Sequence, residues 1–471
     1  MNLAHQLPPD PVIPYLPVAL NAQTMAQLLQ EKVFSNLDLG VRHIEIERIK
    51  YKPGRSCLVC YRLQLIHGTS GKTDELLLCA RFYRSGGSHA PYVRALCNHA
   101  PDTPIHVPLI HLQDFDCLIW VFPNDDKLKA VAVLMDPSAL GREVLPELIE
   151  HHWGNRWSVS HPQAQMVHYF PEHACCTCVT FRLSHQDNEE IQHPVLYCKT
   201  YHNNQGRRTM NSMEQLWHSR LRREGQLSIP RPIAYLQRWK SLWQLEVKGV
   251  PAMERLRIEA DFHHHMARVA TSIAALHQTA VKNLPIAGNG RHSIAHLKRA
   301  LKLIHHVRPE LARPMELLAS HLCRTCPGLQ RRPLATLHGD LHLKNILIDE
   351  QQVHLIDLDD LMLGDPLHDL GSLIASMLHL SLLGKLDQTR VQRSIAALLK
   401  HYQSHVDWHL DANDLCWYVT ASLLTERIAR SIIRVKDGRI ENIQALFELA
   451  GTILLGNAYP AWLPLANEAS R

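Results

Sequence analysis

The sequence has no long apolar run and no strong excess of charge of one sign. Its longest apolar stretch, 370–383, contains His379 and Ser residues and is too short to span a bilayer. The first 17 residues have neither a basic start nor an apolar core, so we expect no secretory signal and a cytoplasmic protein. A formal net charge of +5, with scattered Lys and Arg, gives no indication of nucleic-acid binding.

Disulfide and zinc sites are not indicated either, although the chain has 12 Cys. Six of them fall in pairs with a spacing of three, namely Cys57 with Cys60, Cys175 with Cys178, and Cys323 with Cys326. The first two pairs lie in strand-like runs, where this spacing sends the side chains to opposite faces. We therefore expect buried thiols in a reducing compartment, and we interpret His263 to His265 as a solvated helix face.

Three oxygen-bearing side chains stand out in the C-terminal half. Residues 346–348 and 353–356 are apolar and flank the polar turn 349–352, a pattern that predicts a β-hairpin. Asn345 and Asp357 then lie together at the open end of this hairpin. An Asn amide oxygen and an Asp carboxylate are hard ligands that suit a magnesium ion on nucleotide phosphates.

Asp340 lies five residues before Asn345, on the loop that leads into the hairpin. Its carboxylate could accept the proton of an attacking hydroxyl and orient that hydroxyl toward a γ-phosphate. Any one of these polar residues alone is more simply explained as a turn former. Their order along the chain favours a kinase-like catalytic loop.

This order resembles the signature of the aminoglycoside phosphotransferase and choline kinase family, relatives of the protein kinases. The matching residues are His338-x-Asp340-x-x-x-x-Asn345, Ile356-Asp357 and Gly364-Asp365-Pro366-x-x-Asp369. The resemblance implies ATP as phosphoryl donor, Asp340 as catalytic base, and Asn345 and Asp357 as Mg²⁺ ligands. It implies a bracing role for Asp369 and a supporting place for His338, and it leaves Asp359 as a second ligand or a positioning residue.

The same resemblance implies an α+β, protein-kinase-like bilobal fold, with an antiparallel-sheet small lobe and a mainly helical large lobe. Two segments read as a small lobe, one around 51–83 and one around 169–201. Each has a Tyr-x-Pro turn, a Cys-containing strand that ends in aromatic-Arg-Leu, and a strand that ends in a basic residue two positions before Tyr. We predict a duplicated small lobe; two unrelated hairpins that converged are the alternative.

The second copy has the residues better suited to nucleotide binding. Lys199 ends a strand, and a helix expected to begin near Asn211 offers Glu214 as its partner, which would aim Lys199 at the phosphates. In the first copy the equivalent residue is Arg81, which has no evident acidic partner because 86–100 contains no Asp or Glu. The turn 171–174 lacks the Gly that usually lets backbone amides approach a phosphate.

The apolar strand 242–247 reads as the hinge between lobes, where backbone groups of Glu246 and Val247 would meet an adenine edge. With 471 residues and 46% hydrophobic content, two or three domains are expected. We predict an accessory small-lobe-like domain over 1–156, a kinase-like small lobe over 157–248 and a helical lobe over 249–471.

The function predicted from these residues is an ATP-dependent kinase of a small-molecule hydroxyl. The basic segment 298–313 mildly favours a neutral or anionic acceptor, such as a sugar or other metabolite, over a cationic one. The alternative is a catalytically idle nucleotide-binding regulatory or scaffold protein of the same fold. We expect no nucleic-acid or membrane partner. The first copy would either cap the working small lobe or mediate a homodimer.

Overall fold

The computed structural model describes the chain apart from residues 1, 36, 97–106, 260–261, 289, 436–440, 457–459 and 464–471. The chain divides into two compact units. Unit 1 comprises Met1–Asn204, Leu236–Trp243 and Ser431–Ile440, and unit 2 comprises Gln205–Tyr235, Gln244–Arg430 and Glu441–Arg471. Among the described helices, none is both long enough and apolar enough to cross a membrane.

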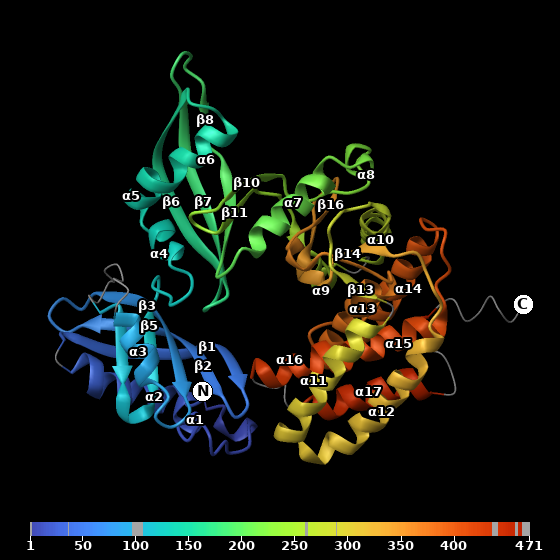
Figure 1. Cartoon of the computed structure of the whole chain (residues 1–471), viewed down its shortest axis with the longest axis horizontal. Helices are drawn as coiled ribbons and strands as arrows, with labels where there is room; N and C mark the ends of the chain where they lie inside the picture. The colour runs from blue at the N-terminus through green and yellow to red at the C-terminus, as the bar shows by residue number, and fades with distance from the viewer. Residues whose placement is uncertain are drawn as a thin grey trace, which may run out of the picture. The chain divides into compact units, whose positions relative to one another are not determined.

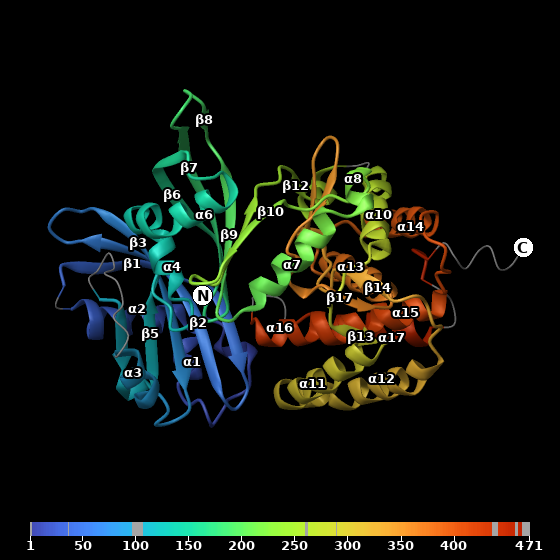
Figure 2. The ribbon, with the colours of Figure 1, turned by 45° about the horizontal axis from the view of Figure 1, so that its top comes forward.

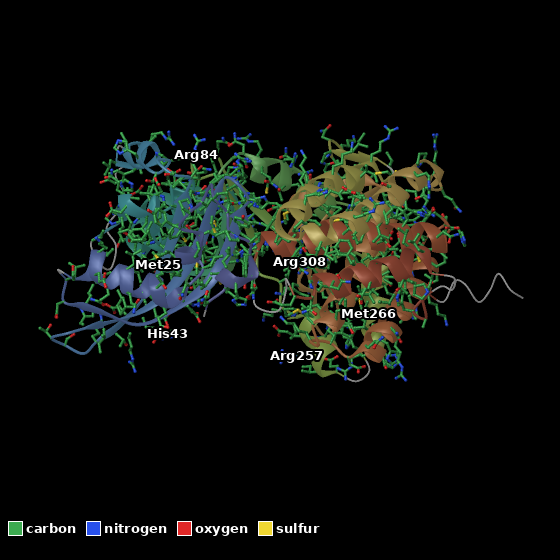
Figure 3. All side chains as sticks on the ribbon, turned by 90° about the horizontal axis from the view of Figure 1, so that it is seen from below. Met25, His43, Arg84, Arg257, Met266 and Arg308 are labelled. Atoms are coloured by element: carbon green, nitrogen blue, oxygen red, sulfur yellow. The ribbon has the colours of Figure 1, made fainter. Side chains whose placement is uncertain are left out.

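The first sheet of unit 1 is antiparallel, with the order β1-β2-β3-β5-β4 (Figure 1). Its strands are β1 (Leu39–Lys52), β2 (Ser56–His67), β3 (Thr73–Tyr83), β4 (Leu109–Leu112) and β5 (Cys117–Val121). Three helices accompany it, α1 (Leu16–Ala19), α2 (Ala22–Leu29) and α3 (His89–Leu96). Asn21 caps α2 by accepting hydrogen bonds from two backbone N–H groups, and α2 contributes the fully buried Met25 (Figure 3).

The second sheet has the order β10-β11-β9-β7-β6, with β8 paired to β7. Its strands are β6 (Trp157–Phe170), β7 (Ala174–His185), β8 (Ile191–Gln192), β9 (Val195–Tyr201), β10 (Pro232–Leu236) and β11 (Ser241–Leu245). The helices before it are α4 (Ala130–Met135), α5 (Pro137–Ala139) and α6 (Leu145–His152). If the short β8 is left out, the strands of the second sheet lie side by side in the same sequence order as those of the first: the first three strands are neighbours, then comes the fifth, and the fourth is at the edge.

Both sheets also fix the turn after their first strand in the same way. In each, a carboxylate from an upstream segment accepts one hydrogen bond from a tyrosine hydroxyl and one from a backbone N–H of the turn. The donors are Tyr51 and Gly54 to Asp10, both at 2.8 Å, and Tyr169 and Glu172 to Asp125, at 2.6 and 2.7 Å. Gly54 and Glu172 share a left-handed backbone, with φ of 65° and 60°.

Unit 2 is mainly helical. Its helices are α7 (Gln205–Trp217), α8 (Arg220–Arg223), α9 (Ala252–Ile258), α10 (His263–Gln278), α11 (Arg291–Val307), α12 (Ala312–Thr325), α13 (Leu367–Leu382), α14 (Gln388–Gln403), α15 (Ala412–Ser422) and α17 (Ile443–Leu455). α16 (Ala429–Ile433) begins in unit 2. The pairs α11 with α12 and α15 with α17 lie side by side (Figure 2). Met266 of α10 is fully buried in this unit (Figure 3).

Two small sheets complete unit 2. One has the order β12-β15-β16 and the other β13-β17-β14. Their strands are β12 (Val250–Pro251), β13 (Ile286–Gly288), β14 (Ala335–Leu337), β15 (Ile346–Ile348), β16 (Val353–Leu355) and β17 (Met362–Gly364). β14 and β17 pack through the buried Ala335, Leu337 and Met362. The loop that follows β14 therefore begins at a well-packed pair of strands.

The expected α+β class is confirmed, with antiparallel sheets in unit 1 and mainly helices in unit 2. The predicted start of a helix near Asn211 is wrong, because α7 begins at Gln205. Its first six residues are polar or small apart from Met210 and carry little helical pattern, but Gly206, Thr209 and Met210 are buried. Tertiary packing therefore extends this helix beyond what its sequence indicates.

Candidate active site

The hairpin of β15 and β16 brings Asn345 and Asp357 to its open end. Ile346 pairs with Leu355, and the Ile356 N–H donates to the Asn345 carbonyl at 3.0 Å. This confirms the predicted hairpin. Asp357 follows at once, with φ of 61°, a left-handed conformation that Asp adopts more readily than most residues.

Asn345 is oriented by a contact with the loop that carries Asp340. Its side chain is buried, and Nδ2 donates to the Asp340 carbonyl oxygen at 3.0 Å. The amide nitrogen is therefore engaged, and Oδ1 is the atom left to meet a cation. With the exposed residue Asp357, the pair offers two hard oxygen ligands and leaves room for phosphate and water, which fits Mg²⁺.

Other metal chemistry finds no support in the described part of the chain. There, no group of three or more His, Cys, Asp or Glu side chains could hold a metal ion. The described cysteines form no disulfide, and most of them are buried. Cys60 and Cys79 are 3.3 Å apart at their sulfur atoms as thiols within the first sheet.

Asp369 holds the start of the loop that carries Asp340. Its Oδ2 accepts hydrogen bonds from the His338 backbone N–H at 2.6 Å and from His277 Nε2 at 3.2 Å, and its Oδ1 accepts from the Gly339 N–H at 3.0 Å. The carboxylate is fully buried. Burial alone would raise its pKa, but the hydrogen bond from His277 and the His368 imidazole 3.9 Å away outweigh burial and hold the pKa of Asp369 well below its ordinary value.

His338 and Gly339 fix the shape of this loop. The His338 side chain is fully buried, and its Nε2 donates to the Ile356 carbonyl at 2.9 Å. Gly339 has φ of 83°, and a Cβ there would overlap the Asp360 carbonyl oxygen. The family resemblance pointed to His338 and Asp369, and the structure brings both together with the loop that carries Asp340.

Asp340 itself forms an ion pair that the sequence did not reveal. Arg430 Nη2 donates to Asp340 Oδ1 at 2.8 Å. Burial would raise the pKa of the Asp340 carboxyl, but the Arg430 guanidinium outweighs burial and lowers this pKa to about 2. His342 Nε2 lies 3.8 Å from Oδ2. Burial lowers the pKa of His342 to about 4, so it is neutral at pH 7 and Arg430 carries the effect there.

Asp359 is held by α7. Its Oδ1 accepts a hydrogen bond from Thr209 Oγ1 at 3.2 Å, and its carbonyl oxygen accepts one from Gln205 Nε2 at 3.4 Å. These contacts engage the carboxylate with protein groups. They favour the interpretation of Asp359 as a positioning residue over that of a second metal ligand.

The four residues predicted to contact the nucleotide fall in different places. Lys199 lies in β9, opposite Cys176, with Nζ 5.9 Å from the centre of the Tyr201 ring. Glu214 is exposed on α7. Lys199 belongs to unit 1 and Glu214 to unit 2, and their pairing stays a prediction. Glu246 and Val247 lie in the irregular segment between β11 and β12, as a hinge would.

The expectation that Arg81 lacks an acidic partner is wrong. Arg81 Nε and Nη2 both contact Glu172 Oε1, at 2.7 and 2.6 Å, and Lys127 Nζ is 3.1 Å from Glu172 Oε2. The partner comes from the second sheet rather than from the segment after Arg81. The same contacts explain how the turn 171–174 manages without Gly, because they hold Glu172 in its left-handed conformation.

Comparisons with known proteins show that part of the chain is similar to a known family. The model of the Phosphotransferase enzyme family matches residues 207–405, a range that includes Asp340, Asn345, Asp357 and Asp369. Residues 207–405 are therefore similar to this phosphotransferase family. No curated protein matches the chain.

Solved structures give weaker likenesses. A choline kinase from Cryptosporidium parvum Iowa II is 12% identical, with a TM-score of 0.45, over 66% of this chain and 94% of that one. A spectinomycin phosphotransferase, in complex with ADP and spectinomycin, is 13% identical, with a TM-score of 0.44, over 66% of this chain and 97% of that one. An aminoglycoside phosphotransferase from Streptomyces rimosus is 20% identical, with a TM-score of 0.37, over 56% and 92%.

Proposed function

We propose that this protein transfers the γ-phosphate of ATP to a hydroxyl group of a small molecule. One observation carries the proposal. Asp340, Asn345 and Asp357 gather around one catalytic loop and one hairpin, linked by the bond from Asn345 Nδ2 to the Asp340 carbonyl, inside the range that matches the phosphotransferase family. A base and two hard cation ligands are the parts that phosphoryl transfer from a nucleotide needs.

In this proposal Asn345 Oδ1 and the Asp357 carboxylate hold Mg²⁺, which would neutralise charge on the β- and γ-phosphates. Asp340 Oδ2 receives the acceptor hydroxyl. The acceptor oxygen forms a bond to the γ-phosphorus, the bond from that phosphorus to the bridging oxygen of ADP breaks, and the hydroxyl proton passes to Asp340 and then to solvent. A carboxylate with a pKa near 2 suits this role, because the loose transition state demands orientation and charge more than a strong base.

The nucleotide contacts are proposed with it. Lys199 would bind the α- and β-phosphates, with Glu214 as its partner, and the backbone at Glu246 and Val247 would bind adenine. The segment at Glu246 is irregular and exposed, so its backbone groups are not used in a sheet. The intact Asp340, Asn345 and Asp357 argue against the idle scaffold alternative.

Replacement of Asp340 tests the proposal. Asp340→Asn should lower turnover by roughly 10²–10⁴-fold, while the affinity for a non-hydrolysable ATP analogue with Mg²⁺ stays within about threefold. Asp387→Asn is the matched control, because Asp387 is an exposed cap of α14. Product is followed by mass spectrometry across a broad panel of hydroxyl compounds. Tight nucleotide binding without product from the unaltered protein would support the scaffold alternative instead.

We also propose that the two sheets of unit 1 derive from a duplication. Their shared strand order and the matching contacts of Asp10 and Asp125 support it. Asp125 binds the turn of the second sheet, so the second copy would begin ahead of Asp125 and would include α4 to α6. The boundaries predicted near 156 and 248, a homodimer and a cytoplasmic location remain predictions.

A further inference from the structure

Arg430 lies in the first turn of α16 and contacts the candidate base directly. The Arg430 and Asp340 side chains are 31% and 25% exposed. A guanidinium has five N–H donors. Within the described ranges of the chain, the bond to Asp340 is the one hydrogen bond found for Arg430. The other four donors of this partly exposed cation make no hydrogen bond with the described residues, so a ligand beside Asp340 could bind them.

The neighbouring arginine is committed elsewhere. Arg427 Nη2 contacts Glu426 Oε2 at 3.0 Å and Ser372 Oγ at 3.4 Å, and its side chain is 10% exposed. Glu426 Oε2 also accepts a hydrogen bond from Ser372 Oγ at 2.8 Å. Arg427 and Glu426 thus form a buried, internally compensated pair, and Arg430 is the more accessible of the two guanidinium groups.

We propose that Arg430 binds an anionic group of the acceptor, a carboxylate or a phosphate ester, next to the hydroxyl that is phosphorylated; this inference rests on the proposed function. Arg430 occupies Oδ1 of Asp340, which leaves Oδ2 for the hydroxyl. A hydroxyl bound there places substituents on neighbouring carbon atoms within reach of the guanidinium. Arg binds carboxylate and phosphate through paired, charge-assisted hydrogen bonds.

The same geometry disfavours a cationic acceptor. An ammonium group on the carbon next to the reacting hydroxyl would meet the Arg430 guanidinium. The Asp340 carboxylate is already paired with Arg430, so it offers an added cation little net attraction. The chain would therefore differ in acceptor charge from enzymes that take amino sugars or choline.

Matched compounds test this inference with the full-length protein. One set is glycerate, glycerol 3-phosphate, glycerol and 2-amino-1,3-propanediol, and the other is gluconate, glucose 6-phosphate, glucose and glucosamine. We expect phosphorylated product mainly from anionic members. Arg430→Gln should raise the KM for them by roughly 10–100-fold and leave the KM for ATP within about threefold, with partial recovery in Arg430→Lys. Arg308→Gln is the control, because Arg308 of unit 2 has a similar side-chain exposure of 27% and also pairs with a carboxylate, that of Glu310.

Binding is measured separately by thermal shift without ATP. Anionic members should stabilise the unaltered protein and the Arg308→Gln protein but not the Arg430→Gln protein. If they do so while no product forms with ATP, the inference about the anion stands and the proposed phosphotransferase function fails. The inference is overturned if neutral or cationic members give the highest kcat/KM, if Arg430→Gln lowers kcat equally for all classes with KM unchanged, or if no anion gives an Arg430-dependent shift.

Discussion

Arg81 and Glu172, 91 residues apart in the sequence, form an ion pair in which two guanidinium nitrogens contact one carboxylate oxygen. Their side chains are 15% and 14% exposed. Arg81 occupies the position in the first sheet that Lys199 occupies in the second. Arg81 binds the carboxylate of Glu172, in the turn 171–174 of the second sheet. The first sheet therefore stabilises the turn that is the candidate for phosphate binding.

Removal of this arginine should destabilise unit 1. Arg81→Met would leave Glu172 with Lys127 as its remaining cation, and we expect the free energy of unfolding to fall by about 1–3 kcal/mol, less than for a fully buried pair. Arg62→Met is the control, because Arg62 pairs with Glu47 at 2.7 Å on the surface, where loss of a pair costs about 1 kcal/mol or less. Urea denaturation measures both, and equal losses would contradict the structural role.

Gly339 should not tolerate a side chain. Gly339→Ala combines a left-handed backbone with a Cβ that overlaps the Asp360 carbonyl oxygen, so the loop that carries Asp340 must move. Because this movement would misplace Asp340, it should lower turnover by roughly 10²-fold. Gly384→Ala is the control, because Gly384 has φ of 65° but open space around it and should cost about 1 kcal/mol of stability with turnover unchanged. Similar effects of both variants on turnover would refute this reading.

Asp369 should make stability depend on acid pH. Its pKa in the folded protein is lowered from about 3.9 in the unfolded chain. Its contribution is therefore complete above about pH 5, and is lost as the pH falls below about 4 toward the folded pKa. Asp369→Asn should lower the free energy of unfolding by about 3–5 kcal/mol at pH 7 and flatten its decline between about pH 5 and 2. Parallel curves for both proteins would count against this account.

The cation ligands should control the Mg²⁺ requirement. Asn345→Ala and Asp357→Asn should each raise the Mg²⁺ concentration for half-maximal turnover by roughly tenfold or more. Glu350→Gln lies in the turn of the same hairpin, at its other end, and is exposed, so it should leave that concentration unchanged. A titration of turnover with Mg²⁺ at saturating ATP separates these variants.

Local patterns predicted the hairpin of the site well, because apolar runs 346–348 and 353–356 and a polar turn leave one pairing register. The chain order of His338, Asp340, Asn345 and Asp357 then indicated which ends of that hairpin matter. The start of α7 was missed, because burial of Gly206 and Thr209 extends the helix where the sequence alone has little helical pattern.

Contacts between segments far apart in the chain could not be predicted from the sequence. Arg430 is 90 residues from Asp340, on a short helix with no motif around it. The Glu172 partner of Arg81 was hidden because it was sought in the segment that follows Arg81. In both cases the sequence shows a single charged residue that would be interpreted as a solvated surface residue, because its counterion is brought close only by the fold.

The two hydrogen bonds of His338 have a consequence for how the site can vary. Its backbone N–H is tied to Asp369 and its ring to the carbonyl of Ile356, so one planar ring spans from the start of the loop to the residue before Asp357. The imidazole thus helps to set the spacing between the proposed proton acceptor, Asp340, and the proposed cation ligand, Asp357. Residues on the surface of the intervening turn could change to suit another acceptor while that spacing is preserved.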